Sequence, residues 1–471
     1  MYVTRPLSLY RNFPSNLSVE PQEGPLSGFL VITDEEAEAE DSFCCGTCKL
    51  RRVKRLPFPQ DKLLTVIHSS DYQEIGNTKV LFIPVLGQPL SSNRYYVIRA
   101  KGKYKGQACK SSRETDMGIC CFNNIINDEK PKPFDHRNIC QQFKIHRYHR
   151  HTFFAKSAAI DGLPPKFLRK KGWEVRSSRL VRSRLREALG LDNSLRALLP
   201  SFDFAISSKR SSSNVVGSWY CPFIFVREKA RLRYQMKKSV FYRMTLEQRW
   251  EEIVSCQNNG SNVVNVNTNV KREVSSVFGT EAIRDNRANH AGFVWFRAYD
   301  RNRVRRASVG LSVAIVEKMR WVEDDGGWVG GGRETEVRVE RVEENTSESG
   351  WQRFGCYVLV ESFALRRMDE TLVLRLSSSN VVELFTVIWF LAVPRLSFSG
   401  TNGFTVLRLQ GVGISSNSFE NLQSFRCFLD VVNAVADDEG NSATDSTLWP
   451  RAITREGMAE AAMAETMAHL F

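Results

Sequence analysis

The stretch EVRVERVE, from Glu336 to Glu343, alternates charged and apolar residues with a period of two. Successive side chains of a β-strand point to opposite faces, so this alternation is typical of a strand with one face buried and the other in water. We expect its three valines to lie on one face. Stretches of similar chemistry flank it, which predicts an antiparallel sheet over residues 261–376, folded as a sandwich or an open barrel-like layer. The further strands are expected at Phe293–Arg297, Leu311–Val322, Cys356–Phe363 and Leu372–Leu374, with a hairpin turn at Met368–Thr371.

Residues 1–150 form a predicted β-rich N-terminal segment. Short runs of β-branched and aromatic residues alternate there with Pro, Gly, Asn and Ser, which is typical of strands joined by turns. The expected strands are Gly28–Thr33, Leu64–Ile67, Lys79–Val85, Tyr95–Ala100 and Gln141–His146. The acidic stretch Asp34–Asp41 is expected to be an exposed loop.

Residues 151–260 form a predicted mixed segment that is more helical. Its clearest helix is expected to begin at Thr245, which can cap it, because Gln248 follows at the spacing of a capping box. Four apolar residues then fall on one helical face: Leu246, Trp250, Ile253 and Val254. Upstream, Gly190 is expected to divide the leucine-rich stretch Leu185–Leu199 into two short turns.

Residues 377–471 differ from the rest of the chain, because they contain five Arg, ten Asp or Glu and no Lys. We expect an unrelated or poorly ordered tail that derives from a fused or mis-spliced reading frame. The predicted fold class is therefore α+β and β-rich, with antiparallel sheets, a few short helices and a poorly ordered C-terminal tail.

The formal net charge of the chain is +14; the tail carries −5, so the first 376 residues carry +19. A body this basic can attract phosphate on nucleic acid or on an anionic membrane, and the alternative is an ordinary soluble surface. Met1–Arg11 lacks the basic start and apolar run of a signal peptide, and no apolar run reaches the ~18 residues of a membrane helix. We therefore expect a soluble, cytoplasmic protein whose 11 cysteines are reduced.

Several phrases mix Pro, Gly, Ser and aromatic residues in an order that generic strands or helices do not require. They include MYVTRPLSLY (Met1–Tyr10), FIPVLGQPLSSNRYYVI (Phe82–Ile98), DGLPPKFLRKKGWEV (Asp161–Val175), WYCPFIFVRE (Trp219–Glu228) and FGCYVLVESFALRRMDETLVL (Phe354–Leu374). Together they resemble a plant family catalogued as domain of unknown function 1262. The resemblance covers about residues 1–374. The family has no assigned activity, so the resemblance implies a family relationship but no substrate or mechanism.

Five cysteines are candidates for chemistry: Cys44, Cys45, Cys48, Cys120 and Cys121. Four thiolates could hold zinc with Cys45 and Cys48 as one arm, although a vicinal Cys-Cys pair makes a poor second arm. Cys45 and Cys48 could instead form a redox disulfide. Cys44 and Cys45 also precede the basic run Lys49–Arg55, and an acyl chain beside a polybasic patch suffices for membrane attachment. Ordinary thiols are the fourth interpretation, and all four stay open at this point.

Three histidines, His146, His149 and His151, have a spacing that can ligate a transition metal. Arg147 and Arg150 lie between them, and their positive charge opposes a bound cation. We therefore interpret this stretch as a solvated basic loop.

Three other patterns carry weaker chemistry. The glycines of Gly326–Gly332 lack the Lys-Ser/Thr of a P-loop, which favours a flexible hairpin loop. The arginines of Arg176–Arg186 could bind nucleic acid, with a solvated surface as the alternative. Ser308 follows two arginines and is a candidate for phosphorylation.

The function predicted from the sequence is binding rather than catalysis. No G-x-S-x-G motif or paired carboxylates near a histidine are present in convincing context, so no catalytic residue and no cofactor are predicted. The leading hypothesis is a non-catalytic binding or interaction module that recognises proteins or an anionic membrane surface. The alternatives are an enzyme whose site assembles from scattered residues and a weak nucleic-acid binder.

Overall fold

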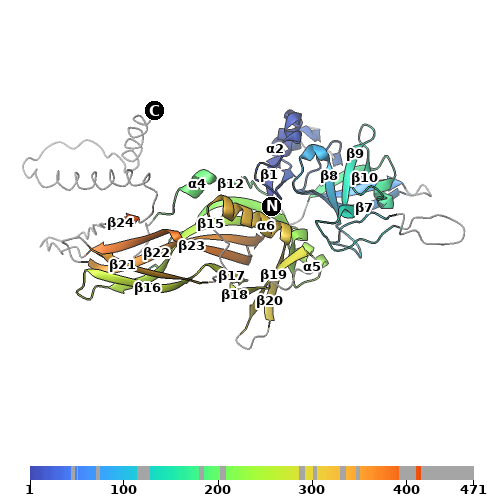
Figure 1. Cartoon of the computed structure of the whole chain (residues 1–471). Coiled ribbons are helices and arrows are strands. Elements are labelled where there is room, and N and C mark those ends of the chain that lie inside the picture. The colour runs from blue at the N-terminus through green and yellow to red at the C-terminus, as the bar shows by residue number, and fades with distance from the viewer. Residues whose placement is uncertain are drawn as a thin grey trace, which may run out of the picture. The chain divides into compact units, whose positions relative to one another are not determined.

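The computed structural model describes residues 1–43, 48–49, 51–69, 75–113, 128–179, 185–201, 208–285, 292–300, 305–328, 336–345, 351–391 and 410–414 (Figure 1). By its internal contacts the chain divides into Met1–Ser415 and Ser416–Phe471. The second unit lies outside the described residues. The first unit is rich in antiparallel strands and has few helices, which confirms the predicted β-rich α+β class.

The larger sheet has 13 strands. They are β1 (Tyr2–Pro6), β2 (Gly28–Ile32), β12 (Gly190–Leu191), β13 (Asn214–Pro222), β14 (Val226–Glu228), β15 (Phe241–Gln257), β17 (Glu273–Val277), β18 (Thr280–Asp285), β19 (Phe293–Tyr299), β20 (Arg305–Ser312), β22 (Trp351–Arg367), β23 (Leu372–Leu391) and β24 (Gln410–Ile414). The hydrogen-bonded order is β14-β20-β19-β18-β17-β23-β22-β15-β13-β1-β2, with β12 on β13 and β24 on β23. Only the β1–β2 ladder is parallel among the described pairs of this sheet.

The helix predicted from Thr245 is wrong, because these residues form the centre of β15. The strand is paired with β22 from Tyr242 to Gln257. The polar residues that suggested a helix cap are buried strand residues with partners on neighbouring elements: Gln248 Nε2 donates to Glu361 Oε1 at 2.9 Å. A long ladder provides hydrogen-bond partners for main-chain groups along most of its length, and this outweighs a local capping signal.

The strand predicted for Leu311–Val322 is also wrong beyond its first residues. β20 ends at Ser312, and α6 (Val313–Asp325) follows. The buried residues of α6 include Ile315, Met319 and Val322, whose spacing is that of one helical face. They pack into the main hydrophobic core together with side chains of the sheet.

The other helical elements are short. They are α1 (Leu7–Asn12), α2 (Glu35–Glu40), α3 (Lys166–Arg169), α4 (Asn193–Ala197) and α5 (Leu232–Lys238), with 3₁₀ turns η1 (Pro14–Ser18), η2 (Leu90–Ser92), η4 (Ile139–Gln141) and η5 (Phe223–Phe225). The loop expected at Asp34–Asp41 is therefore wrong: α2 occupies it, and Ala37 is its buried contact. The expected division at Gly190, which has φ +101°, is observed, but only one of the two expected turns forms: residues 185–189 are irregular, β12 begins at Gly190 and α4 follows.

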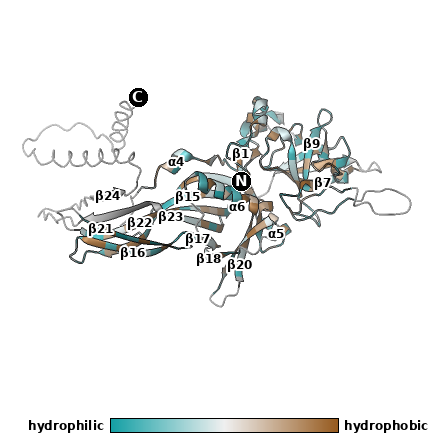
Figure 2. Cartoon of the chain, in the orientation of Figure 1, coloured by the Kyte–Doolittle hydropathy of each residue, from teal (hydrophilic) through white to brown (hydrophobic). Residues whose placement is uncertain are grey.

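A second layer over part of the large sheet confirms the predicted sandwich. The strands β16 (Val263–Lys271) and β21 (Glu336–Glu344) pair with each other along their whole length. Val266 and Val339 pack against Phe354 and other side chains of β22 in a separate core. Brown and teal residues both occur along these strands in Figure 2. The expectation of three valines on one face is wrong for Val342, which is 69% exposed. Val337 and Val339 are two positions apart and share a face, whereas Val342 is three positions from Val339, so its side chain points to the opposite face.

The smaller sheet closes on itself. Its strands are β5 (Arg52–Val53), β6 (Lys62–Ser69), β7 (Ile75–Pro84), β8 (Arg94–Arg99), β9 (Gln142–Arg147), β10 (Phe153–Ser157) and β11 (Glu174–Arg179), in the order β10-β9-β8-β7-β6-β11-β5. Phe153 N donates to Trp173 O at 2.9 Å and so joins β10 to the start of β11. Phe58, Phe82 and Trp173 fill the core of this closed sheet. A separate short ladder pairs β3 (Ser42–Phe43) with β4 (Cys48–Lys49).

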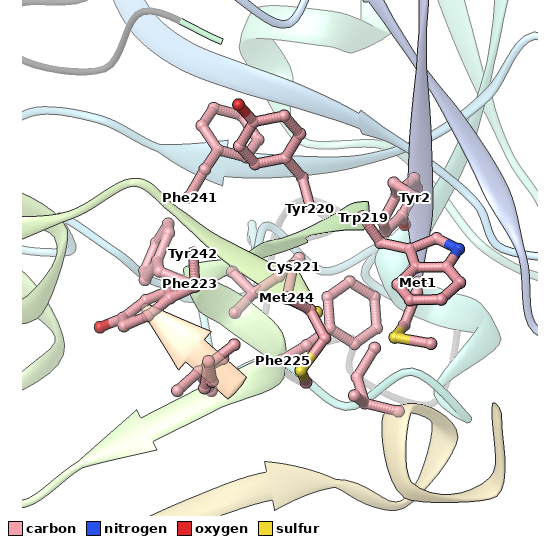
Figure 3. Close-up of a cluster of buried hydrophobic side chains, with 14 of the residues drawn as sticks. Met1, Tyr2, Trp219, Tyr220, Cys221, Phe223, Phe225, Phe241, Tyr242 and Met244 are labelled. Carbon is pink, nitrogen blue, oxygen red and sulfur yellow. The ribbon is translucent and has the colours of Figure 1, made fainter. Parts of the chain in front are cut away.

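The predicted domain limits differ from the sheets in two places. β1 and β2 belong to the large sheet, although they lie within residues 1–150. Figure 3 shows Met1 and Tyr2 beside Trp219 in the main core, where both are buried. β23 crosses the limit at residue 376 and stays paired with β22 as far as Leu391, because the residues after Ser377 continue the same strand.

A buried ion pair ties α4 to the inner face of the large sheet. Arg196 donates from Nε to Glu361 Oε1 at 2.8 Å and from Nη2 to Oε2 at 2.7 Å. Its Nη1 donates to Val322 O at 2.9 Å, which links the pair to α6. The side chain of Glu361 is 2% exposed, so its charge depends on these partners.

We predict that Arg196→Met lowers the free energy of unfolding by about 3–5 kcal/mol, because it leaves the Glu361 carboxylate buried without its cation. Urea denaturation followed by tryptophan fluorescence measures the change. The double variant R196M/E361L should recover most of the loss. Arg338→Met is the control, since the Arg338–Glu340 pair is exposed and should contribute at most about 1 kcal/mol. Equal losses for both single variants would contradict the prediction.

Candidate functional site

A cavity of about 360 Å³ lies between the turn that follows β8 and the start of α5. It is lined by Lys103, Lys105, Gln107, Arg231, Leu232 and Arg233. Four of these six residues are cationic, and no acidic residue lines the cavity within the described part of the chain. The two segments are more than 120 residues apart in the sequence, so only the fold creates this concentration of charge.

The turn after β8 is held by main-chain hydrogen bonds. Gly106 N donates to Arg99 O at 2.8 Å, and Arg99 N donates to Gln107 O at 2.9 Å. Gly106 has φ +87°, and a Cβ built there would lie 3.1 Å from Leu232 Cβ. Glycine is therefore required both by the backbone conformation and by the close approach of α5.

Hydrogen bonds anchor α5 on the opposite wall. The buried Gln235 donates from Nε2 to Val226 O at 2.8 Å and to the Tyr242 hydroxyl at 3.1 Å. The nearby carboxylate of Glu228 accepts from Arg367 Nε at 3.0 Å and from the Tyr242 hydroxyl at 2.5 Å. Since Glu228 is neutralised by Arg367 inside the fold, the cations of α5 face the cavity without that counter-charge.

Two tyrosines accompany the cations of the cavity. Arg233 lies 4.7 Å from the ring centroid of Tyr234, and its Nη2 donates to the Tyr234 hydroxyl at 2.8 Å. Lys103 lies 5.9 Å from the ring centroid of Tyr104. Such cation–ring contacts hold long side chains in place without removing their charge.

The sequence interpretation missed this site, although its signals are visible. The runs KGKYKG at 101–106 and KARLR at 229–233 are basic, and no Asp or Glu occurs between Glu74 and Glu114 or between Glu228 and Glu247. Each run by itself is too short to distinguish from an ordinary solvated surface. The site becomes visible only when the fold brings these two basic runs together.

The five candidate cysteines lie in or beside stretches that the structure does not describe. Cys44, Cys45, Cys120 and Cys121 lie outside the described residues, and only the main chain of Cys48 is described, in β4. The zinc, redox and lipid interpretations therefore stay predictions. No group of three or more His, Cys, Asp or Glu with metal-binding geometry occurs within the described ranges.

The three candidate histidines lie on and beside the turn between β9 and β10. The ring of His146 stacks on Phe154, with centroids 4.8 Å apart. Burial, followed by Lys144 and Lys156, lowers the pKa of His146 below its ordinary value. His149 and the partly exposed His151 follow in the turn, so positive charge surrounds these imidazoles, as the interleaved arginines indicated.

The remaining candidates are dispersed. Arg176 is an exposed strand residue of β11, Arg186 is exposed after it, and 180–184 lie outside the described residues. Ser308 is 5% exposed on β20, so its phosphorylation, which stays a prediction, requires this strand to open. Gly326 and Gly327 follow α6, so the glycine run joins a helix, not a strand, to β21; residues 329–335 are not described.

Two ionisable groups beside the main core, Lys318 and the half-buried Glu323, have pKa shifts of the kind that a hidden enzyme site could use. Burial lowers the pKa of Lys318, which is 0% exposed, to about 8. Its ammonium lies 3.8 Å from the ring centroid of Trp321 and donates to Glu23 O. Burial raises the pKa of Glu323 to about 7, although Ser378 Oγ donates to its Oε1 at 3.0 Å. Neither residue lines the cavity.

Comparison with known proteins supports part of the resemblance. A model of a family described as protein of unknown function (DUF1262) matches residues 23–122, which include the turn after β8 but not α5. The resemblance is thus confirmed over these residues. No curated protein matches the chain. A crystal structure of Cry35Ab1 is similar at 11% identity over 70% of this chain and 90% of that chain, with a TM-score of 0.38.

Among the described helices, none has the length and apolar character needed to cross a membrane. This agrees with the absence of a long apolar run in the sequence.

We predict that Glu323 makes a contribution to the free energy of unfolding that falls as the pH rises from 4.5 to 7. The folded state holds a proton on Glu323 that the unfolded state, with an ordinary pKa of 4.5, has already released. Glu323→Gln should flatten this part of the pH profile in urea denaturation. Glu317→Gln, at an exposed position of the same helix, is the control and should retain the wild-type slope. A profile unchanged by Glu323→Gln would refute the assignment.

Proposed function

We propose that this protein is a non-catalytic binding module that attaches to an anionic membrane surface through the cationic cavity. The observation that carries the proposal is the convergence of Lys103, Lys105, Arg231 and Arg233 on one cavity without an acidic lining residue. Phosphate head groups are the chemistry that such a lining suits, because arginine presents a planar fork to phosphate oxygens and lysine a mobile point charge.

The magnitude of the electrostatic attraction is sufficient for reversible attachment. A Lys or Arg near an anionic lipid surface contributes about 1 kcal/mol, so four such residues would contribute about 4 kcal/mol, close to a millimolar dissociation constant. Neighbouring exposed cations, among them Lys101, Lys237 and Lys238, would add to this attraction. The interaction would weaken at high salt, since the Debye length falls to about 3 Å at 1 M ionic strength.

The cellular setting is part of the proposal. The five described cysteines that form no disulfide, four of them buried, support a reducing compartment. We therefore place the protein in the cytoplasm, on the inner, anionic leaflet of a membrane. The resemblance to a plant family supports a plant cell as its source. We do not extend the proposal to catalysis, because Lys318 and Glu323 lie away from the cavity lining.

We predict that the full chain co-sediments with vesicles of phosphatidylcholine and phosphatidylserine at low salt, and not with phosphatidylcholine alone. The double variant K103E/R233E should lose at least about 30-fold in vesicle affinity, because it removes two cations worth about 1 kcal/mol each and adds repulsion.

The matched control is K144E/K156E, which makes a comparable charge change at exposed lysines of β9 and β10. This control should lose less than about threefold. Equal losses for the two double variants would show that only net charge matters. Absence of vesicle binding by the unmodified chain would refute the proposal outright.

A further inference from the structure

A second cationic surface, with exposed aromatic rings, lies on the turn between β9 and β10. We define the hairpin surface by its residues: His146, Arg147, Tyr148, His149, Arg150, Phe154 and Lys171. The rings of Tyr148 and His149 are 4.0 Å apart between centroids, and those of Tyr148 and Phe154 are 6.3 Å apart, edge to face. Lys171 Nζ lies 5.6 Å from the Tyr148 centroid and 5.7 Å from that of Phe154.

The turn that presents these rings is well defined. Tyr148 N donates to Thr152 O at 2.9 Å, and His149 N donates to Thr152 Oγ1 at 3.1 Å. Tyr148 is 43% exposed, so part of its ring is accessible to a ligand. The described residues provide no hydrogen-bond partner for Nε2 of the neighbouring His146.

Positive charge surrounds this turn from two directions. No Asp or Glu occurs between Asp135 and Asp161. Arg52 and Lys54, from the segment of β5, approach the turn closely enough to act with Arg147 and Arg150 on the imidazole of His151. Glu174, on the neighbouring β11, is engaged by Arg52. Figure 2 shows mainly hydrophilic residues around β9.

The hairpin surface and the cationic cavity lie at opposite ends of β8. The antiparallel register pairs Arg94, the first residue of β8, with Lys144 on β9, so the turn after β9 lies beyond the start of β8. The cavity turn instead follows Arg99, the last residue of β8. The six residues of β8 span about 20 Å, so the two surfaces are separate sites.

We propose that the hairpin surface binds single-stranded nucleic acid. Exposed rings on a cationic surface are the elements that unpaired bases and their phosphates require: bases stack on the rings without strong sequence preference, and cations follow the backbone. Tyr148 and His149 would stack bases, and Arg147, Arg150 and Lys171 would bind phosphates. Paired bases of a duplex would not reach these rings, which distinguishes the proposal from attraction by charge alone.

Fluorescence anisotropy of a labelled twelve-nucleotide oligouridine with the full chain tests the proposal. We expect salt-dependent binding that Tyr148→Ala weakens by about tenfold, within the range for removal of one stacked base. Because Tyr148 carries no charge, the slope of log affinity against log salt should stay unchanged. R147A/R150A should make that slope shallower by about 0.7 for each phosphate that is no longer neutralised by an arginine.

The matched control is Tyr234→Ala, which removes a tyrosine of similar exposure, 49%, at the cavity. It should leave oligouridine binding unchanged. K103E/R233E should weaken vesicle binding by at least about 30-fold without altering the effect of Tyr148→Ala on oligouridine, so the two proposals fail separately. Equal affinity of Tyr148→Ala and the unmodified chain, tighter binding of a duplex of the same length, or no oligouridine binding at low salt would each overturn the inference.

Discussion

The ladder between β15 and β22 is the constraint on which the rest of the structure depends. Each of these strands has 17 residues, and β22 continues the sheet to β23. The inner face of the ladder receives α6 and the main hydrophobic core, while part of the outer face is covered by β16 and β21. Two such layers can meet along one ladder only because its polar side chains are paired, as Arg196 is with Glu361.

The same principle explains where free positive charge remains. Three carboxylates of the large sheet form ion pairs with arginines inside the fold. Glu228 pairs with Arg367, and Glu361 pairs with Arg196. Glu247 pairs with both Arg366 and Arg375. The cations on the closed sheet and on α5 have fewer acidic neighbours in sequence. Acidic side chains therefore neutralise arginines within the large sheet, whereas the surfaces at the two ends of β8 keep their positive charge. This difference is the physical basis of both proposed binding functions.

Sequence patterns predicted the strands well wherever one face is buried and the other is polar. EVRVERVE is such a stretch, and the turn at Met368–Thr371 follows the same logic, with Arg367 N donating to Thr371 O at 3.0 Å. The prediction failed at Thr245–Val254, because polar residues buried on both faces of a strand imitate the spacing of a helix. It failed at α6 because the end of β20 and the first turn of α6 lie in one uncharged, valine-rich stretch, 309–316, with no sequence signal between them.

The sequence by itself determined the β-rich class, the basic body and the individual basic runs, since these depend on residue type and local spacing alone. Only the tertiary structure decided which runs meet. Lys103 and Arg233 share a cavity because Gly106 lets the turn approach Leu232, and Lys171 reaches Tyr148 because Phe153 and Trp173 close the smaller sheet. Such contacts join residues far apart in the chain, and their geometry is set by packing and hydrogen bonds that no local pattern encodes.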